Sequence, residues 1–180
     1  MAQDAPSIHM NLIDLFDRRP RAVLAAVAGL CVSLLAFGLY LQHVVGLEPC
    51  PMCIVQRYTM VLVALVALLG AAWPSERLGV RFAAAGMVLL AGFGAFVAAR
   101  QSFLQWYPPQ EASCGRDFYG MIETFPLQRV VPMIFKGSGD CAAIDWTFLT
   151  LTIANWSFLN FCLIGAVGLG LMWRTFAAKR

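Results

Sequence analysis

The chain has 180 residues, of which 60% are hydrophobic and 13% are charged, and its mean hydropathy is +0.71. A soluble domain could not keep so apolar a composition in water, so these values indicate an integral membrane protein. The formal net charge of +3 is small, and the flanks of membrane spans account for it. The composition therefore gives no reason to expect a nucleic-acid partner.

Four stretches are apolar enough to cross a bilayer, which takes roughly 20 helical residues each. They cover about 22–42, 54–73, 80–99 and 156–172. The last begins with polar residues, so its exact start, and whether it is partly re-entrant, stay open. The sequence predicts an all-α membrane protein with a single domain over 1–180, built as a bundle of four transmembrane helices.

Basic residues flank these spans unevenly. Three precede the first span, two lie by the link between the second and third, and three follow the last: Arg18, Arg19, Arg21; Arg77, Arg81; Arg174, Lys179, Arg180. The short link between the first and second spans has none. The positive-inside rule then places both termini in the cytoplasm and the loops at about 43–53 and 100–155 on the outer side, which in a bacterium is the periplasm.

The first span is about twice as long as the apolar core of a signal peptide, so we expect it to be retained. Within the long outer loop, 118–135 mixes apolar and charged residues between prolines. This pattern favours a short helix on the membrane surface, with a small soluble cap as the alternative. The five tryptophans lie near span ends, as expected of an interfacial belt.

The six cysteines divide by expected depth. Cys31 and Cys162 fall inside the first and fourth spans, where we expect buried free thiols that act as small apolar side chains. The other four lie on the outer side: Cys50, Cys53, Cys114 and Cys141. Disulfides persist in an oxidising compartment, and four cysteines allow three pairings.

Cys50 and Cys53 form a Cys-x-x-Cys pair at the start of the second span. Pro51 suits the first position of a helix, so both sulfurs should lie near unpaired backbone N–H groups that favour a thiolate. Arg57 follows Cys53 by one turn, on the same helical face. Such a cation at membrane depth favours a role in redox chemistry over a snorkelling side chain, whereas the role of Gln56 stays open.

Three segments of the chain resemble one known family. They read EPCPMCIVQR at 48–57, LQWYP at 104–108 and GSGDC at 137–141, the last followed by Trp146. With four outer cysteines on four spans, the chain is similar to the disulfide bond formation protein B (DsbB) family over nearly its whole length. The resemblance implies an inner-membrane thiol:quinone oxidoreductase that reoxidises a periplasmic, DsbA-like thioredoxin-fold dithiol oxidase.

The resemblance also implies a role for each outer cysteine. Cys114 and Cys141 would form the disulfide that the reduced partner attacks, with Cys114 taking the partner into a mixed disulfide. Cys141 would then exchange with Cys50. Cys53 would pass electrons to a membrane quinone, ubiquinone or menaquinone, with Arg57 stabilising the charge.

One position departs from the pattern of some family members, which carry a histidine near the outer end of the third span. This chain has Gln101 there, after Arg100. A glutamine can hydrogen-bond a quinone carbonyl but cannot donate a proton as an imidazolium does. We expect Arg100 and Gln101 to be neighbours of the quinone.

Three other kinds of protein share some of these features. The four cysteines could hold zinc, although a second Cys-x-x-Cys is lacking. A scaffold with a disulfide-stapled loop, like tetraspanins, would not need Arg57 beside the cysteine pair. Proteins like vitamin K epoxide reductase also use four spans, but their Cys-x-x-Cys lies near the last one.

Overall fold

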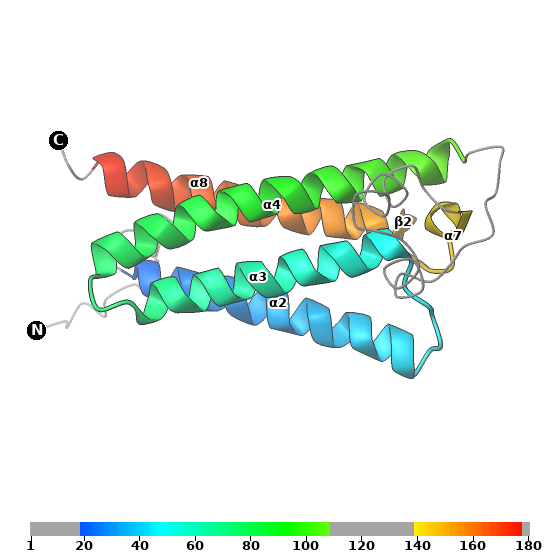
Figure 1. Cartoon of the computed structure of the whole chain (residues 1–180), viewed down its shortest axis with the longest axis horizontal. Helices are drawn as coiled ribbons and strands as arrows, with labels where there is room; N and C mark the ends of the chain where they lie inside the picture. Colours follow the sequence, from blue (N-terminus) through cyan, green and yellow to red (C-terminus); the bar gives the residue numbers. More distant parts are fainter. Residues whose placement is uncertain (1–18, 109–138, 178–180) are drawn as a thin grey trace, which may run out of the picture.

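The computed structural model describes residues 19–108 and 139–177. Four long helices dominate it (Figure 1): α2 (Pro20–His43), α3 (Pro51–Ala72), α4 (Glu76–Trp106) and α8 (Ile153–Ala177). Each is long and apolar enough to cross a membrane, which confirms the predicted all-α bundle of four spans. The predicted membrane-surface helix and Cys114 lie outside the described residues.

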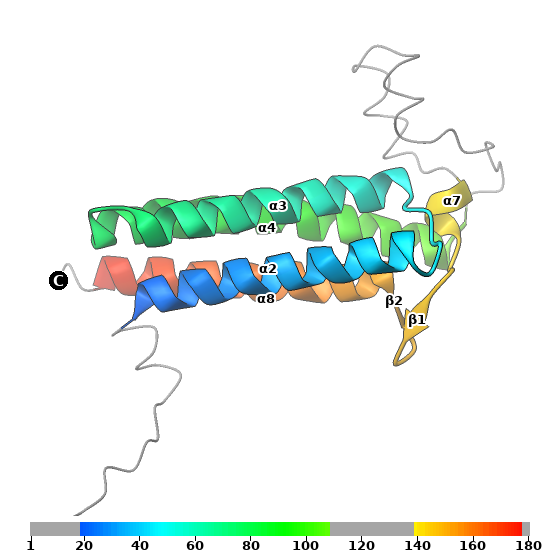
Figure 2. The ribbon, with the colours of Figure 1, turned by 90° about the horizontal axis from the view of Figure 1, so that it is seen from below.

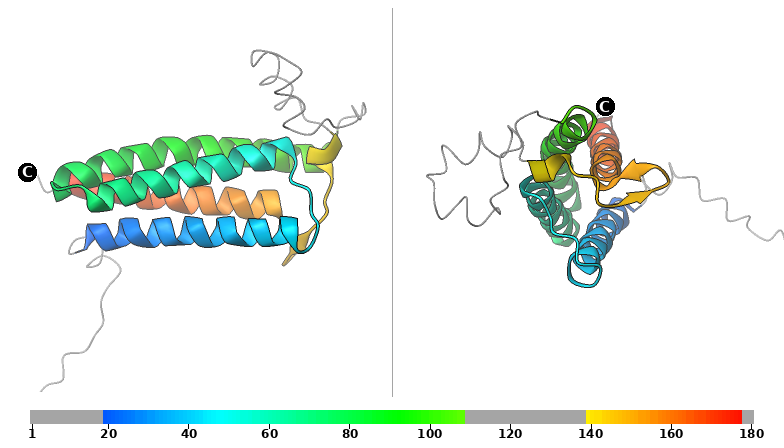
Figure 3. Two further views of the ribbon diagram at one scale, coloured as in Figure 1. Left: turned by 60° about the horizontal axis from the view of Figure 1, so that its bottom comes forward. Right: turned by 90° about the vertical axis from the view of Figure 1, so that its right-hand side faces the viewer.

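The helices pack in sequence around the bundle. α2 packs on α3, α3 on α4, and α4 on α8 (Figures 2 and 3). One end of the bundle carries Arg21, Arg77, Arg81 and Arg174, and we call it the arginine end. The opposite end, where α3 begins and α4 ends, carries the helix α7 (Gly139–Ala142) and a hairpin of β1 (Thr147–Phe148) and β2 (Leu151–Thr152). We call it the cysteine end.

Local sequence explains where the helices begin and end. Cys50 is the N-cap of α3 and Pro51 its first residue, where a missing N–H costs no hydrogen bond. α3 stops before Trp73, whose extended backbone suits a residue that precedes proline. α8 is helical from Ile153 onward, so its polar first turns continue the span as regular helix.

α4 runs well past the apolar segment predicted at 80–99. Its 31 residues correspond to about 46 Å at the helical rise, more than the roughly 30 Å of a hydrocarbon core. The added turns carry Gln101, Ser102 and Leu104, which are all buried. The extension thus brings polar side chains of α4 to the level of the first turn of α3.

Small residues allow α4 and α8 to approach closely. Gly94 of α4 faces the fully buried ring of Phe161 from α8, and a Cβ added at Gly94 would lie 2.4 Å from that ring. Close packing through small residues is the usual way for membrane helices to associate, because lipid supplies no hydrophobic drive between them. The α4–α8 contact therefore depends on the absence of a side chain at Gly94.

Gly94→Ala should destabilise the bundle by about 1–3 kcal/mol, because the buried ring of Phe161 has no free space to move into. Thermal unfolding in detergent measures this loss. Gly92→Ala in the same helix is the matched control, since nothing lies within 4 Å of its added Cβ. The control should be neutral or slightly stabilising because alanine favours helix; equal losses in both variants would contradict the close-packing argument.

Candidate functional site

Three of the four outer cysteines meet at the cysteine end. Cys50 and Cys53 lie at the start of α3, with their sulfurs 3.3 Å apart. Cys141 lies in α7, which packs on α4, and is only 1% exposed. Met52 of α3 and Val97 and Leu104 of α4 pack into the same apolar cluster. The fold thus brings three sulfurs from two separate segments together against apolar side chains of α4.

The surroundings of Cys50 correct one expectation. Its hydrogen bonds to Cys141 and Cys53, together with its burial, raise the pKa of the Cys50 thiol far above its ordinary value. The prediction that the helix start favours a thiolate is therefore wrong for Cys50. Its neighbours are sulfurs and apolar side chains, which favour the neutral thiol over the thiolate.

Two buried glutamines hold an amide against the sulfurs. Gln56 of α3 is 3% exposed and Gln101 of α4 is 4% exposed. The Nε2 of Gln56 donates to the Oε1 of Gln101 at 2.7 Å, which occupies the acceptor side of that amide. The Nε2 of Gln101 then donates to the sulfurs of Cys53 at 3.2 Å and Cys50 at 3.4 Å. Gln101 therefore lies at the sulfurs, with its amide orientation fixed by Gln56. Its predicted place beside a quinone stays a prediction.

The side chain of Arg57 is held by the last turns of the neighbouring helix α2. Its Nη1 donates to the Oε1 of Gln42, and its Nη2 donates to the carbonyl oxygen of Gly38 at 3.0 Å. Both acceptors belong to α2. A guanidinium at membrane depth needs such partners, because lipid offers none. These bonds hold the positive charge between α2 and α3, one turn from Cys53.

Cys53 and Arg57 line two different cavities. The first, of about 70 Å³, lies at the cysteine end, and we call it the end cavity. The second, of about 110 Å³, lies between α2, α3 and α8, and we call it the flank cavity. The end cavity is also lined by Glu48, Cys50, Gln101, Gln105 and Trp146, and the flank cavity by Leu34, Leu35, Gly38, Gln56, Met60, Trp156, Ser157 and Asn160.

Gln105 connects α4 to the segment that carries Cys141. Its Nε2 donates to the carbonyl oxygen of Ala143 at 3.5 Å, and its Oε1 accepts from the hydroxyl of Thr152 at 2.7 Å. Sequence reasoning did not identify Gln105 or Thr152 as site residues. It also missed Gln42 and Gly38, which only the packing of α2 on α3 brings to Arg57. Asn160 was missed as well, because only the assembled bundle places it in the lining of the flank cavity.

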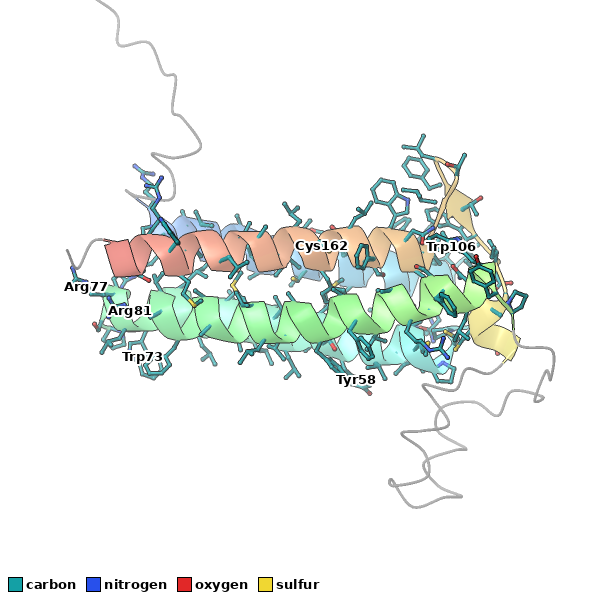
Figure 4. The ribbon with its side chains drawn as sticks, turned by 90° about the horizontal axis from the view of Figure 1, so that it is seen from above. Tyr58, Trp73, Arg77, Arg81, Trp106 and Cys162 are labelled. Atoms are coloured by element: carbon teal, nitrogen blue, oxygen red, sulfur yellow. The ribbon has the colours of Figure 1, made fainter. Side chains whose placement is uncertain are left out.

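The remaining candidate residues lie elsewhere. Arg100 lines neither cavity, and its guanidinium carbon is 5.5 Å from the ring centroid of Phe103; its place beside a quinone stays a prediction. Cys31 is fully buried in the core, as expected. Cys162 is exposed on the outer face of α8 (Figure 4), so the expectation that it is buried is wrong. Its neighbours Phe161 and Ile164 occupy the inward positions of that turn instead.

Within residues 19–108 and 139–177, no group of three or more His, Cys, Asp or Glu is arranged to hold a metal ion. The described part of the site thus combines three thiols and one guanidinium with several side-chain amides. This set of groups is suited to thiol–disulfide exchange and to stabilising negative charge on sulfur or on a bound electron acceptor.

Comparison with known proteins agrees with this chemistry. The family model for disulfide bond formation protein DsbB matches residues 20–171. Disulfide bond formation protein B from Polaromonas sp. (strain JS666) is 71% identical over 160 residues, covering 88% of this chain and 94% of that protein. Its counterpart from Polaromonas naphthalenivorans is 68% identical over 165 residues, covering 92% and 96%.

A more distant relative extends the similarity. Disulfide bond formation protein B from Azoarcus sp. (strain BH72) is 49% identical over 162 residues, covering 90% of this chain and 96% of that protein. In each case nearly the full length of both proteins is aligned. The chain belongs to the disulfide bond formation protein B family, as a multi-pass membrane protein.

Proposed function

We propose that this protein is a thiol:quinone oxidoreductase that reoxidises a periplasmic, DsbA-like dithiol protein and passes the electrons to a membrane quinone. The observation that carries the proposal is that Cys53 and Arg57 line both cavities. One cavity lies at the end of the bundle, where soluble thiols arrive, and the other on its flank among apolar side chains. Cys53 and Arg57 are therefore in a position to pass electrons from thiols at the end cavity to a quinone in the flank cavity.

The orientation follows from charge. The arginine end carries the basic residues that favour the cytoplasm, so both termini would lie there, in the inner membrane of a bacterium. The cysteine end would then face the periplasm, where disulfides persist. The three sulfurs would then lie on the side where a soluble thioredoxin-fold partner is expected.

The proposed exchange begins at the Cys114–Cys141 disulfide. A thiolate of the partner attacks Cys114, forming a mixed disulfide and releasing Cys141 as a thiolate. The second thiol of the partner then attacks that mixed disulfide, which frees Cys114 and leaves the partner oxidised. In these two steps the partner gives up two electrons and two protons, and the disulfide of the loop is reduced to two thiols.

The next exchange moves the reducing equivalents to α3. Cys141 attacks Cys50 of a Cys50–Cys53 disulfide, so an S–S bond forms between them and Cys53 leaves as a thiolate. Support comes from the hydrogen-bonded contact of Cys50 with both Cys141 and Cys53. Cys114 then attacks Cys141 to restore the loop disulfide, and Cys50 is released as the second thiol of the reduced pair.

The flank cavity has the features expected of a quinone site. Its walls are mainly apolar, with a few polar groups from α3 and α8, as is usual for small-molecule sites. Arg57 and Asn160 line it and have N–H groups suited to the carbonyl oxygens of a quinone head. A quinone bound there would accept two electrons and two protons from the reduced Cys50 and Cys53 pair and become a quinol, while the Cys50–Cys53 disulfide re-forms.

Arg57→Ala should leave thiol exchange with the partner in place and slow quinone reduction by about 10- to 100-fold, the effect of losing a charge-assisted hydrogen bond. Loss of quinone absorbance, followed with the reduced partner in excess, measures the rate. Arg57→Lys keeps the charge without the planar fork and should be intermediate. If Arg57→Ala reduces quinone at the parent rate, Arg57 has no part in the proposed quinone reduction.

Gln101→Leu should slow quinone reduction by about tenfold or more, because it removes the amide that donates to both sulfurs. The same absorbance assay applies. Ser102→Ala is the matched control. Ser102 follows Gln101 in α4, and its buried hydroxyl has no hydrogen-bond partner. The control should retain the full rate; equal effects of the two changes would mean that only packing at this turn matters.

The function as a whole is tested by mapping disulfides in protein trapped during turnover with a reduced thioredoxin-fold protein and ubiquinone. Successive pairings among Cys50, Cys53, Cys114 and Cys141 are expected. If these cysteines never change partners, the proposed exchange is wrong. Stoichiometric zinc in the purified protein without quinone reduction would indicate the metal-binding alternative.

A further inference from the structure

The hairpin at the cysteine end has an unusual turn. β1 pairs with β2 in the register Thr147↔Thr152 and Phe148↔Leu151, so only Leu149 and Thr150 connect the strands. Both have positive φ, 50° and 67°, as a tight primed turn requires. Asparagine and glycine favour that conformation, whereas leucine and β-branched threonine resist it. The turn thus keeps an apolar apex at a conformational cost.

The chain around this hairpin is apolar. No charged residue occurs between Asp145 and Arg174, a stretch that includes the hairpin and nearly all of α8. Leu149 is 70% exposed and Phe148 53% exposed. A two-stranded hairpin in water is marginal even with a polar surface. The described residues that contact the hairpin leave this apex uncovered.

The hairpin reaches sideways from the bundle. Figures 2 and 3 show it projecting to the side, past α2 and α8. It leads directly into α8, because Ile153 follows Thr152 without a linker. Its apex therefore lies beside the outer ends of two membrane-spanning helices, where the surface of the bilayer begins.

Aromatic contacts hold the hairpin in this direction. Trp146 packs against Phe37 of α2 at 5.9 Å and against Phe148 at 6.1 Å between ring centroids. Trp156 of α8 lies 6.0 Å from Phe148, and its indole Nε1 donates to the Phe148 carbonyl oxygen at 3.1 Å. Tryptophan and tyrosine prefer the membrane interface, so these contacts tie the hairpin to the level of the headgroups.

We propose that the 147–152 hairpin is a lipid anchor, with Leu149 and Phe148 inserted among the headgroups and upper acyl chains of the outer leaflet. Burial of these side chains in lipid would offset the strain of the turn. The insertion is shallow, because the open edges of a two-stranded hairpin need hydrogen bonds that the hydrocarbon core cannot supply.

Photocrosslinking tests the proposed contact. A benzophenone amino acid replaces Leu149 in the full-length protein, which is reconstituted in vesicles of phosphatidylethanolamine and phosphatidylglycerol with a soluble thioredoxin-fold protein outside. Mass spectrometry should detect phospholipid adducts at least fivefold more often than with the same probe at Ile144. Ile144 is the matched control because it is 53% exposed at the same end but lines the end cavity. Equal lipid yields, or an adduct with the soluble protein, would overturn the proposal.

A second variant separates lipid contact from turn stability. Leu149→Asn combined with Thr150→Gly supplies the residues that this turn prefers and removes the apolar apex. If lipid holds the hairpin, amide hydrogen exchange over 146–152 in lipid nanodiscs should become several-fold faster than in the parent protein. If the hairpin is only a solvent-exposed turn, exchange should stay equal or become slower because the turn strain is relieved, and the proposal would fail.

Discussion

The hydrocarbon core supplies no hydrogen bonds, and this constraint shapes both the bundle and its site. Backbone groups satisfy one another in four long helices, and the polar side chains around the site find partners on neighbouring helices. Arg57 of α3 therefore binds the Gly38 carbonyl of α2, and Gln56 of α3 binds Gln101 of α4. The same bonds that satisfy these groups also hold the charge and the amide beside Cys53, so the stability of the bundle and the geometry of the site have one cause.

Packing then determines which residues reach the sulfurs. Gly94 lets α8 lie close against α4, and the extra turns of α4 carry Gln101 and Gln105 to the level where α3 begins. Gln105 in turn holds the chain around Ala143, which keeps Cys141 near Cys50. Through α4, the packing at Gly94 inside the bundle is in this way connected to the segment that carries Cys141 at its end.

The sequence was sufficient to predict the spans and the candidates Cys50, Cys53 and Arg57, because hydropathy and spacing along one helix are local properties. It could not predict how helices rotate about their axes, and so Cys162 was expected inside the core but faces outward. The raised pKa of Cys50 was likewise missed, since it depends on Cys141, which is distant in sequence. The hairpin escaped prediction because leucine and threonine give no turn signal.

Trp156 connects the flank cavity to the hairpin. Trp156 lines the flank cavity and donates its indole N–H to Phe148 of the hairpin. If the hairpin is anchored in lipid, Trp156 and the start of α8 are held at a fixed depth, and Asn160 one turn further along α8 is held with them. The depth at which the bilayer meets the bundle then sets the height of one wall of the flank cavity relative to Cys53 on α3. On this argument, lipid contact at the surface and electron transfer below it are coupled through the first turns of α8.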